Sequence, residues 1–221
     1  MKPTERLAEA TAPDGSVLSL LRHDRDYILR VNGADLMSTR RHSSEDALAD
    51  VGCAPLGTRP GAAVLIGGLG LGFTLRTALA LLPPDAHVVV AEIVQAVIDW
   101  NRNPDYHLAA ESLADPRVEV RRADVTDVLR DSAGRFDAIM LDVDNGADAL
   151  MPGNARLYDD TGIRLTVAAL RPGGRIVYWL AEADRPFMKA LRRAGLTVES
   201  VPARAHAERG ARHALMVAWT G

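Results

Sequence analysis

From residue 62 onward, short apolar runs alternate with segments of helical character, and this alternation limits the possible folds more than any other feature. The apolar runs are 63–66, 87–91, 118–120, 138–141 and 175–179, and the helix-like segments lie near 73–82, 93–102, 124–131, 158–170 and 185–194. Strands that alternate with helices are joined by crossover connections, which produce a parallel sheet covered on both faces. The pattern therefore predicts an α/β protein built on a doubly wound, mostly parallel sheet.

The two ends of the chain depart from this pattern. Residues 16–38 alternate around the pair Asn32-Gly33, a strong hairpin signal because both residues tolerate positive φ. Residues 197–201 and 214–219 are strand-like with no helix between them, so we expect them to pair antiparallel at one sheet edge. The sequence thus predicts a small N-terminal β-meander and an antiparallel C-terminal edge.

A short helix is expected between the meander and the main sheet. Ser43 and Ser44 precede Glu45 and Asp46, and a serine oxygen here can accept hydrogen bonds from the free amides of the first helical turn. We divide the chain into residues 1–58, which hold the meander and this helix, and residues 59–221, which form the main α/β domain.

Composition and charge exclude several classes of protein. The 221 residues carry a formal net charge of −3 and no basic stripe, so neither nucleic acid nor a membrane surface is expected as a partner. The single cysteine cannot form an internal disulfide and the N-terminus lacks the apolar core of a signal peptide, so we expect a cytoplasmic protein. His206 and His213 lack metal-ligand spacing, and no metal is expected.

A glycine-rich loop follows the first long apolar run. It consists of Gly67, Gly68, Leu69, Gly70, Leu71 and Gly72, and a helix is predicted from Phe73. Glycines at this point permit a tight turn and a close approach of the backbone to a ligand, and the helix start offers unpaired N–H groups. We interpret the loop as a cofactor-binding site; the alternative is that its glycines serve packing alone.

An acid follows the second apolar run at the spacing expected for a nucleoside site. Glu92 lies twenty positions beyond Gly72, with Ile93 beside it, and a carboxylate there can accept hydrogen bonds from two ribose hydroxyls. The alternative is a solvated acid favoured by the dipole of the next helix. Glycine loop and acid together predict an adenosine-type cofactor.

Further acids follow the next two strands. Asp124, followed by Val125, either accepts a hydrogen bond from an adenine amino group or caps the next helix. Asp142, with Asp144 and Asp148 behind it, suits a cationic amine substrate or a base that takes a proton from one; acidic loops also occur without function.

Two other residues are candidates for substrate contact. His42 either faces the cofactor pocket or lies in a surface turn. Tyr158 either edges the pocket or belongs to the core, where aromatic residues at helical positions are common.

These motifs, in this order, resemble those of the polyamine synthase group, the spermidine synthases and their relatives, within the class I S-adenosylmethionine-dependent methyltransferase fold. The resemblance covers about residues 60–200 and is carried by the segments 64–76, 92–97, 115–124, 136–142, 157–158 and 170–174. It implies a Rossmann-like fold and S-adenosylmethionine or its decarboxylated form as the cofactor. It also implies a catalytic role for Asp142, an adenine contact at Asp124 and a homodimer.

The departures from the resemblance bear on the reaction. Leu71 stands where the synthases place an aspartate that faces the propylamine group of their cofactor, and their tyrosine-histidine pair is replaced by the stretch 43–46. An aspartate there would repel the carboxylate of intact S-adenosylmethionine by about 4 kcal/mol at ~4 Å and an effective dielectric constant of ~20. Leucine removes that repulsion, and Arg40, Arg41 or His42 could supply a compensating positive charge.

Three functions therefore remain open. The leading hypothesis is methyl or other alkyl transfer from S-adenosylmethionine to a small polar or amine substrate, with Asp142 orienting or deprotonating the acceptor and Asp144 as a second catalytic candidate. The alternative is aminopropyl transfer from decarboxylated S-adenosylmethionine to putrescine. The third is a non-catalytic relative that binds a nucleoside or a polyamine.

Overall fold

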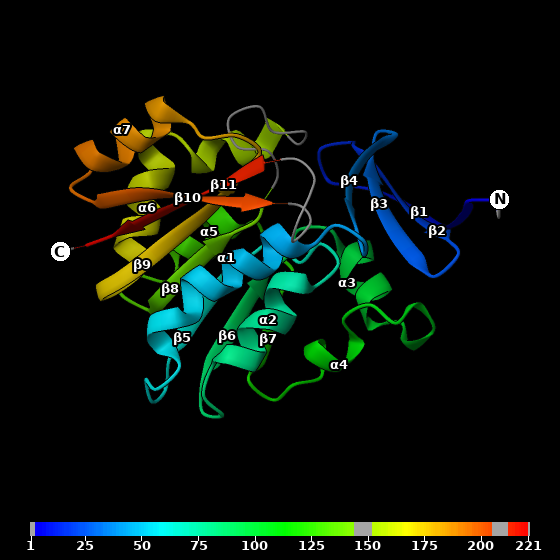
Figure 1. Cartoon of the computed structure of the whole chain (residues 1–221), viewed down its shortest axis with the longest axis horizontal. Helices are drawn as coiled ribbons and strands as arrows, with labels where there is room; N and C mark the ends of the chain where they lie inside the picture. Colours follow the sequence, from blue (N-terminus) through cyan, green and yellow to red (C-terminus); the bar gives the residue numbers. More distant parts are fainter. Residues whose placement is uncertain (1–2, 144–151, 205–211, 221) are drawn as a thin grey trace.

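The computed structural model describes residues 3–143, 152–204 and 212–220. These residues form two β-sheets. A small antiparallel sheet of four strands lies beside a larger α/β body built on seven strands (Figure 1).

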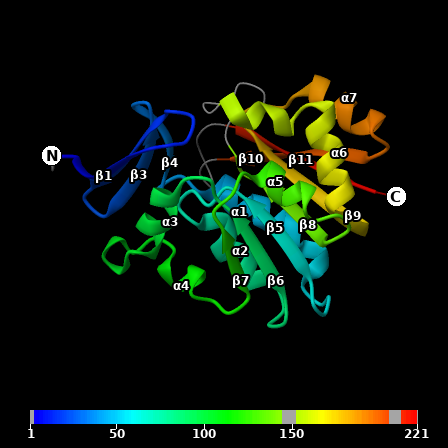
Figure 2. The same cartoon turned by 180° about the vertical axis from the view of Figure 1, so that it is seen from behind.

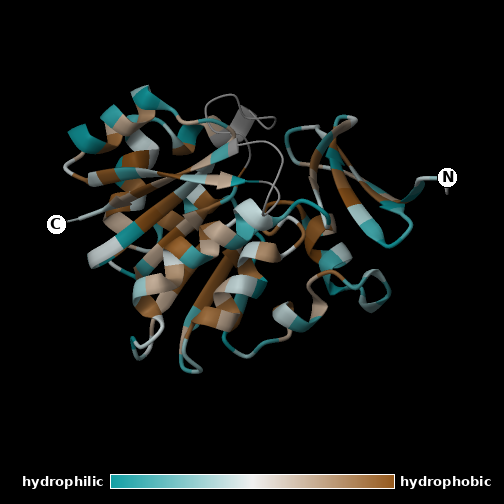
Figure 3. Ribbon diagram, in the orientation of Figure 1, coloured by the Kyte–Doolittle hydropathy of each residue, from teal (hydrophilic) through white to brown (hydrophobic). Residues whose placement is uncertain are grey.

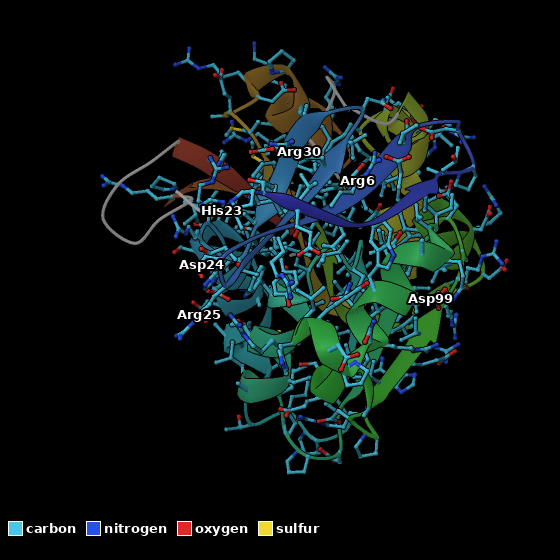
Figure 4. All side chains as sticks on the ribbon, turned by 90° about the vertical axis from the view of Figure 1, so that its right-hand side faces the viewer. Arg6, His23, Asp24, Arg25, Arg30 and Asp99 are labelled. Carbon is cyan, nitrogen blue, oxygen red and sulfur yellow. The ribbon has the colours of Figure 1, made fainter. Side chains whose placement is uncertain are left out.

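The small sheet is the predicted meander with one strand added in front. Its strands, paired in chain order, are β1 (Glu5–Thr11), β2 (Val17–His23), β3 (Asp26–Val31) and β4 (Ala34–Ser38). Asn32 and Gly33 turn the chain between β3 and β4 with φ of 50° and 84°, as the hairpin signal predicted. Leu20 and Leu29 face the common core, whereas Arg6 and Arg30 lie on the outer, charged face (Figure 4).

The large sheet has the predicted parallel centre. Its strands are β5 (Ala63–Gly67), β6 (His87–Ala91), β7 (Val118–Arg121), β8 (Phe136–Leu141), β9 (Leu170–Leu180), β10 (Thr197–Arg204) and β11 (Arg212–Trp219). The spatial order is β10-β11-β9-β8-β5-β6-β7. Strands β5 to β9 pair in parallel, and β11 runs antiparallel to both β9 and β10. The strand order reverses at β5, which places a ligand-binding crevice at the carboxyl ends of the strands around it.

Helices cover both faces of the large sheet. One face carries α1 (Ser43–Cys53), α2 (Phe73–Leu81) and α3 (Gln95–Arg102), with α4 (Ala110–Leu113) at its edge (Figure 1). The other carries α5 (Val125–Arg130), α6 (Asp160–Ala169) and α7 (Arg185–Arg193) (Figure 2). The described residues also form the 3₁₀ helices η1 (Ala54–Leu56), η2 (Pro104–Tyr106) and η4 (Pro152–Leu157).

Each central strand is apolar on both sides, as a doubly covered sheet requires. In β5, Val64 and Ile66 join the core beneath α1 and α2, whereas Ala63 and Leu65 join the core beneath α5 and α6. The central strands accordingly form the hydrophobic interior in Figure 3, with polar residues at the loops and the outer helix faces. No helix of the described residues is long and apolar enough to cross a bilayer.

Helix α1 begins where the sequence predicted it, but not with the predicted cap. Its N-cap is His42 and no side chain caps its first turn, because Ser43 and Ser44 lie within the helix rather than before it; the Ser44 hydroxyl donates to the Glu45 carboxylate. The helix lies close to β8: a Cβ on Gly52 would stand 2.6 Å from the Met140 sulfur. The division of the chain between residues 58 and 59 stays a prediction.

Candidate functional site

A cavity opens at the carboxyl ends of the central strands, between the two sheets. Its floor is formed by residues that follow β5, β6, β7 and β8, and its opposite wall by apolar side chains of the small sheet. These wall residues are Leu18, Leu29, Val31, Leu36 and Met37. Glu45 of α1 and Trp179 of β9 complete the lining at one side.

The glycine loop brings its backbone to the cavity at two positions. Gly68 and Gly70 line it, with φ of 90° and 52°, values that favour glycine. A Cβ on Gly68 would lie 2.4 Å from the Asp142 carbonyl oxygen, so no other residue fits between the ends of β5 and β8. Gly67 and Leu69 do not line the cavity, and Gly72 lines a neighbouring hollow.

Glu92 connects this loop to the end of β6. Its Oε2 accepts a hydrogen bond from the Leu69 N–H at 3.0 Å, and its Oε1 accepts one from the Val94 N–H at 2.8 Å. Burial raises the pKa of the Glu92 carboxyl, and these backbone donors counteract that rise. The side chain lines the cavity together with Ile93, so the acid both fixes the loop and faces the space where a ligand would lie.

Asp124 caps a helix, which is one of its two predicted roles. It is the N-cap of α5 and accepts hydrogen bonds from the Thr126 N–H at 2.8 Å and the Thr126 hydroxyl at 2.6 Å. Asp124 and Val125 also line the cavity. The adenine contact at Asp124 stays a prediction.

Asp142 lies directly after β8 and shares the cavity with Glu45, an acid that comes from α1. Removal from water, and then the negative charge of Glu45, raise the pKa of Asp142 to about 8. Burial likewise raises the pKa of Glu45. The Thr74 hydroxyl lies 3.3 Å from Asp142 Oδ2, and as a donor it opposes the rise of the Asp142 pKa.

The Thr74 contact gives a first prediction. Thr74→Val keeps the shape of the side chain but removes the donor to Asp142, so the pKa of Asp142 should rise further, by about 0.5–1 unit for one hydrogen bond. If Asp142 acts as a base, the rising limb of the rate-against-pH profile should move to higher pH by that amount. Thr161→Val, an exposed threonine on α6 away from Asp142, is the control. A profile that does not move in Thr74→Val would contradict the prediction.

The cavity is acidic and lacks basic residues among its described lining. Glu45, Glu92, Asp124 and Asp142 line it, and no Arg, Lys or His does. The three basic side chains expected to compensate a cofactor carboxylate contact other acids. Arg40 pairs with Asp26 at 2.5 Å, Arg41 approaches Asp35 at 3.8 Å, and His42 Nδ1 lies 2.6 Å from Asp46.

The two low-ranked substrate candidates lie outside this cavity. The His42 ring stacks on Phe73 with centroids 4.4 Å apart and lines the neighbouring hollow, as does Leu71. The Tyr158 ring packs in the core against Tyr178 and Phe187, with centroids 5.8 and 5.3 Å away. Asp144 and Asp148 lie outside the described residues. Within the described part of the chain, no three His, Cys, Asp or Glu side chains gather as they would around a metal ion.

Sequence reasoning missed the apolar wall of the small sheet and, among the polar and aromatic lining residues, Glu45 and Trp179. Glu45 was interpreted only as part of a helix start, and Trp179 only as part of a strand. A signal existed for each, namely an acid beside the first apolar positions of a short helix and an aromatic residue at the carboxyl end of a strand. Neither signal says which face of the element meets the cavity.

The strand order, the glycine loop and the acid after β6 define a protein of the class I methyltransferase-like fold. Among solved structures with this fold, the spermidine synthase of Thermotoga maritima matches with a TM-score of 0.77 and 16% identity, over 98% of this chain and 73% of that one. A spermidine synthase in complex with the transition-state analogue AdoDATO matches with a TM-score of 0.79 and 18% identity, over 98% and 74%.

Comparison with curated sequences leads to the same group. Polyamine aminopropyltransferases from two strains of Leptospira biflexa serovar Patoc are 30% identical over 150 residues. The match covers 66% of this chain and 50% of the relatives, so the chain spans about half the length of the curated relatives it matches. No protein-family model matches. The resemblance inferred from the sequence is confirmed: the chain is spermidine synthase-like.

These comparisons overturn methyl transfer as the leading hypothesis. The curated relatives are named aminopropyltransferases and the solved neighbours are spermidine synthases, which favours the alternative reaction. The physical reason lies in the cavity. The missing acid at Leu71 was the argument for intact S-adenosylmethionine, but Glu45 brings an acid to the cavity from another element, and no described lining residue offers a cation to a carboxylate.

Proposed function

We propose that the protein is a polyamine aminopropyltransferase, which moves the 3-aminopropyl group of decarboxylated S-adenosylmethionine onto a diamine such as putrescine. The acid-rich cavity, with no basic residue among its described lining, carries the proposal. Both substrates are cations, and carboxylates in a partly desolvated site favour cations and repel the carboxylate that distinguishes intact S-adenosylmethionine.

The described residues fit the adenosine part of such a donor. Gly68 and Gly70 bring backbone to the cavity, and a Cβ would clash with the Asp142 carbonyl oxygen (2.4 Å) at Gly68 and with the Met37 sulfur (2.6 Å) at Gly70. Glu92, which is buried, and Asp124, which is half-buried, supply acceptors for ribose hydroxyls and an adenine amino group, and Ile93 and Val125 offer apolar contacts to the ring. The similar spermidine synthase was solved in complex with the transition-state analogue AdoDATO, which supports a ligand of this kind for the cavity.

The sulfonium of the donor activates the adjacent propyl carbon. An acceptor amine nitrogen forms a bond to that carbon, the carbon–sulfur bond breaks, and its electron pair stays on sulfur as methylthioadenosine leaves. The amine must first be held uncharged and in line, which is the part of the reaction that protein side chains control. Asp142 accepts the proton that the amine gives up, and its raised pKa matches it to an amine near neutral pH.

Product analysis tests the proposal. The protein, given decarboxylated S-adenosylmethionine and putrescine, should form spermidine and methylthioadenosine in equal amounts, detected by mass. Intact S-adenosylmethionine in place of the decarboxylated form should give no product. Failure to form any aminopropylated amine from a panel of diamines would contradict the proposal.

The partners follow from the same proposal. They are small-molecule amines, with neither nucleic acid nor a membrane involved. A cytoplasmic location and a homodimer stay predictions, and light scattering of the purified protein would test the dimer.

A further inference from the structure

Glu45 is a buried acid for which the reaction scheme gives no role. It lies in the first turn of α1 and is 6% exposed, and it lines the cavity that holds Asp142. The Ser44 hydroxyl, a neutral donor, is the side chain that hydrogen-bonds its carboxylate. Within the described residues, no Arg, Lys or His lines the cavity; His42 pairs with Asp46 and acts on Glu45 only through its charge, which lowers the pKa of that carboxyl.

Contacts of neighbouring residues hold Glu45 toward the cavity. Asp46 accepts hydrogen bonds from the Thr77 hydroxyl at 2.7 Å and pairs with His42 on the side away from the cavity. Successive residues of a helix are rotated by about 100°. Fixing Asp46 against α2 therefore holds the helix in the rotation at which Glu45 faces the cavity. The Thr74 hydroxyl lies 3.5 Å from the Glu45 carbonyl oxygen and 3.3 Å from Asp142, which ties α1 to the end of β8.

Trp179 is also a residue of the cavity, with a polar group that lacks a hydrogen-bond partner among the described residues. This group is the buried indole Nε1. The Trp179 ring also lies against the His213 ring, with centroids 4.6 Å apart, and an aromatic ring is a favourable contact for an ammonium group. The described lining of the cavity therefore includes two acids without an ion-pair partner and one aromatic side chain.

Two carboxylates in one partly desolvated cavity are costly without a cation, because each disfavours ionisation of the other. A primary ammonium group has three donors and one positive charge, so it can hydrogen-bond to both acids and offset one of their two charges. A hydroxyl or a neutral amide could not offset the charge.

We propose that Glu45 is a specificity-determining residue that, together with Asp142, binds the reacting ammonium group of the acceptor diamine. The inference rests on the proposed function. Glu45 holds the amine in place while Asp142 takes its proton, so Glu45 should govern acceptor affinity rather than adenosine binding.

Calorimetry on the full chain measures acceptor affinity and adenosine binding separately. With methylthioadenosine present to fill the adenosine end, Glu45→Gln should bind putrescine about 10- to 100-fold more weakly than the wild type, the range expected for a lost charged hydrogen bond. Its affinity for methylthioadenosine alone should stay within about 2-fold, which also shows that the variant folds. Asp50→Asn, an exposed acid on the same helix, should change neither affinity.

Other results would overturn the inference. Unchanged putrescine affinity in Glu45→Gln, or an equal loss of methylthioadenosine affinity, would do so. So would a loss confined to decarboxylated S-adenosylmethionine, which would assign Glu45 to the donor. Failure of the proposed function looks different: the wild type would bind putrescine in a Glu45-dependent way yet form no aminopropylated product.

Discussion

Replacement of Asp142 by Asn is expected to lower aminopropyl transfer by about 10²- to 10⁴-fold, the range for loss of a general base. Asparagine occupies the same volume but accepts no proton. Affinity for methylthioadenosine should stay within about 2-fold, because Glu92 and the glycine loop remain. Steady-state rates with decarboxylated S-adenosylmethionine and putrescine, and calorimetry with methylthioadenosine, measure the two effects. A variant that retains most of the wild-type rate would remove Asp142 from the chemistry.

The same substitution should stabilise the ligand-free protein at high pH. The pKa of Asp142 is raised from its ordinary value of 3.8 to about 8, so between these values the folded state binds a proton that the unfolded state has lost. Stability therefore falls as pH rises through that window. Asp142 is only partly buried, so we discount the full shift and expect Asp142→Asn to be more stable than the wild type by about 1–2 kcal/mol at pH ~9 and by little at pH ~4.

Thermal unfolding at the two pH values tests the stability difference. Asp131→Asn, an exposed acid at the end of α5, is the control and should show no such dependence on pH. A stability difference that is the same at both pH values would contradict the raised pKa of Asp142.

Replacement of Gly68 by Ala should destabilise the fold by about 3–5 kcal/mol and weaken methylthioadenosine binding at least 10-fold. The position has a φ of 90°, which costs a side-chain-bearing residue about 1–2 kcal/mol. The added Cβ would also stand 2.4 Å from the Asp142 carbonyl oxygen, which is backbone and cannot turn aside. The ends of β5 and β8 must therefore separate, and the cavity loses its floor.

Gly195→Ala is a matched control for this clash. Gly195 has a φ of 87°, and a Cβ there would meet nothing within 4 Å. Urea unfolding of both variants should show the backbone cost alone, about 1 kcal/mol, for Gly195→Ala and a much larger loss for Gly68→Ala. Equal losses would mean that the approach of Gly68 to Asp142 has no energetic effect.

The fold was predictable because its signals are local. Apolar runs such as 87–91 and 138–141, glycines at a strand end, and Asn32-Gly33 each restrict the chain over a few residues. The structure places β6 and β8 at these runs and the hairpin at this pair. The added strand β1 was missed, because its sequence alternates weakly and its pairing with β2 depends on tertiary contact.

The candidate site was predictable only in part. Gly68, Glu92, Asp124 and Asp142 end strands, and the carboxyl ends of parallel strands meet at one edge, so sequence position brings them to the cavity. Tyr158 and His42 lie on or beside helices, where a side chain can face either core or cavity. The local sequence does not resolve that choice, and the structure turns both away from the cavity.

The sequence by itself determined the parallel sheet, the glycine loop and the order of acids along one sheet edge, because each depends on residues close together in the chain. Only the tertiary structure decided the charge of the cavity. Glu45 reaches it from a separate helix, and Arg40, Arg41 and His42 are drawn into ion pairs elsewhere. Electrostatic environment depends on all charges within a few ångströms, whatever their distance in sequence, so the nature of the substrate follows from packing rather than from any single motif.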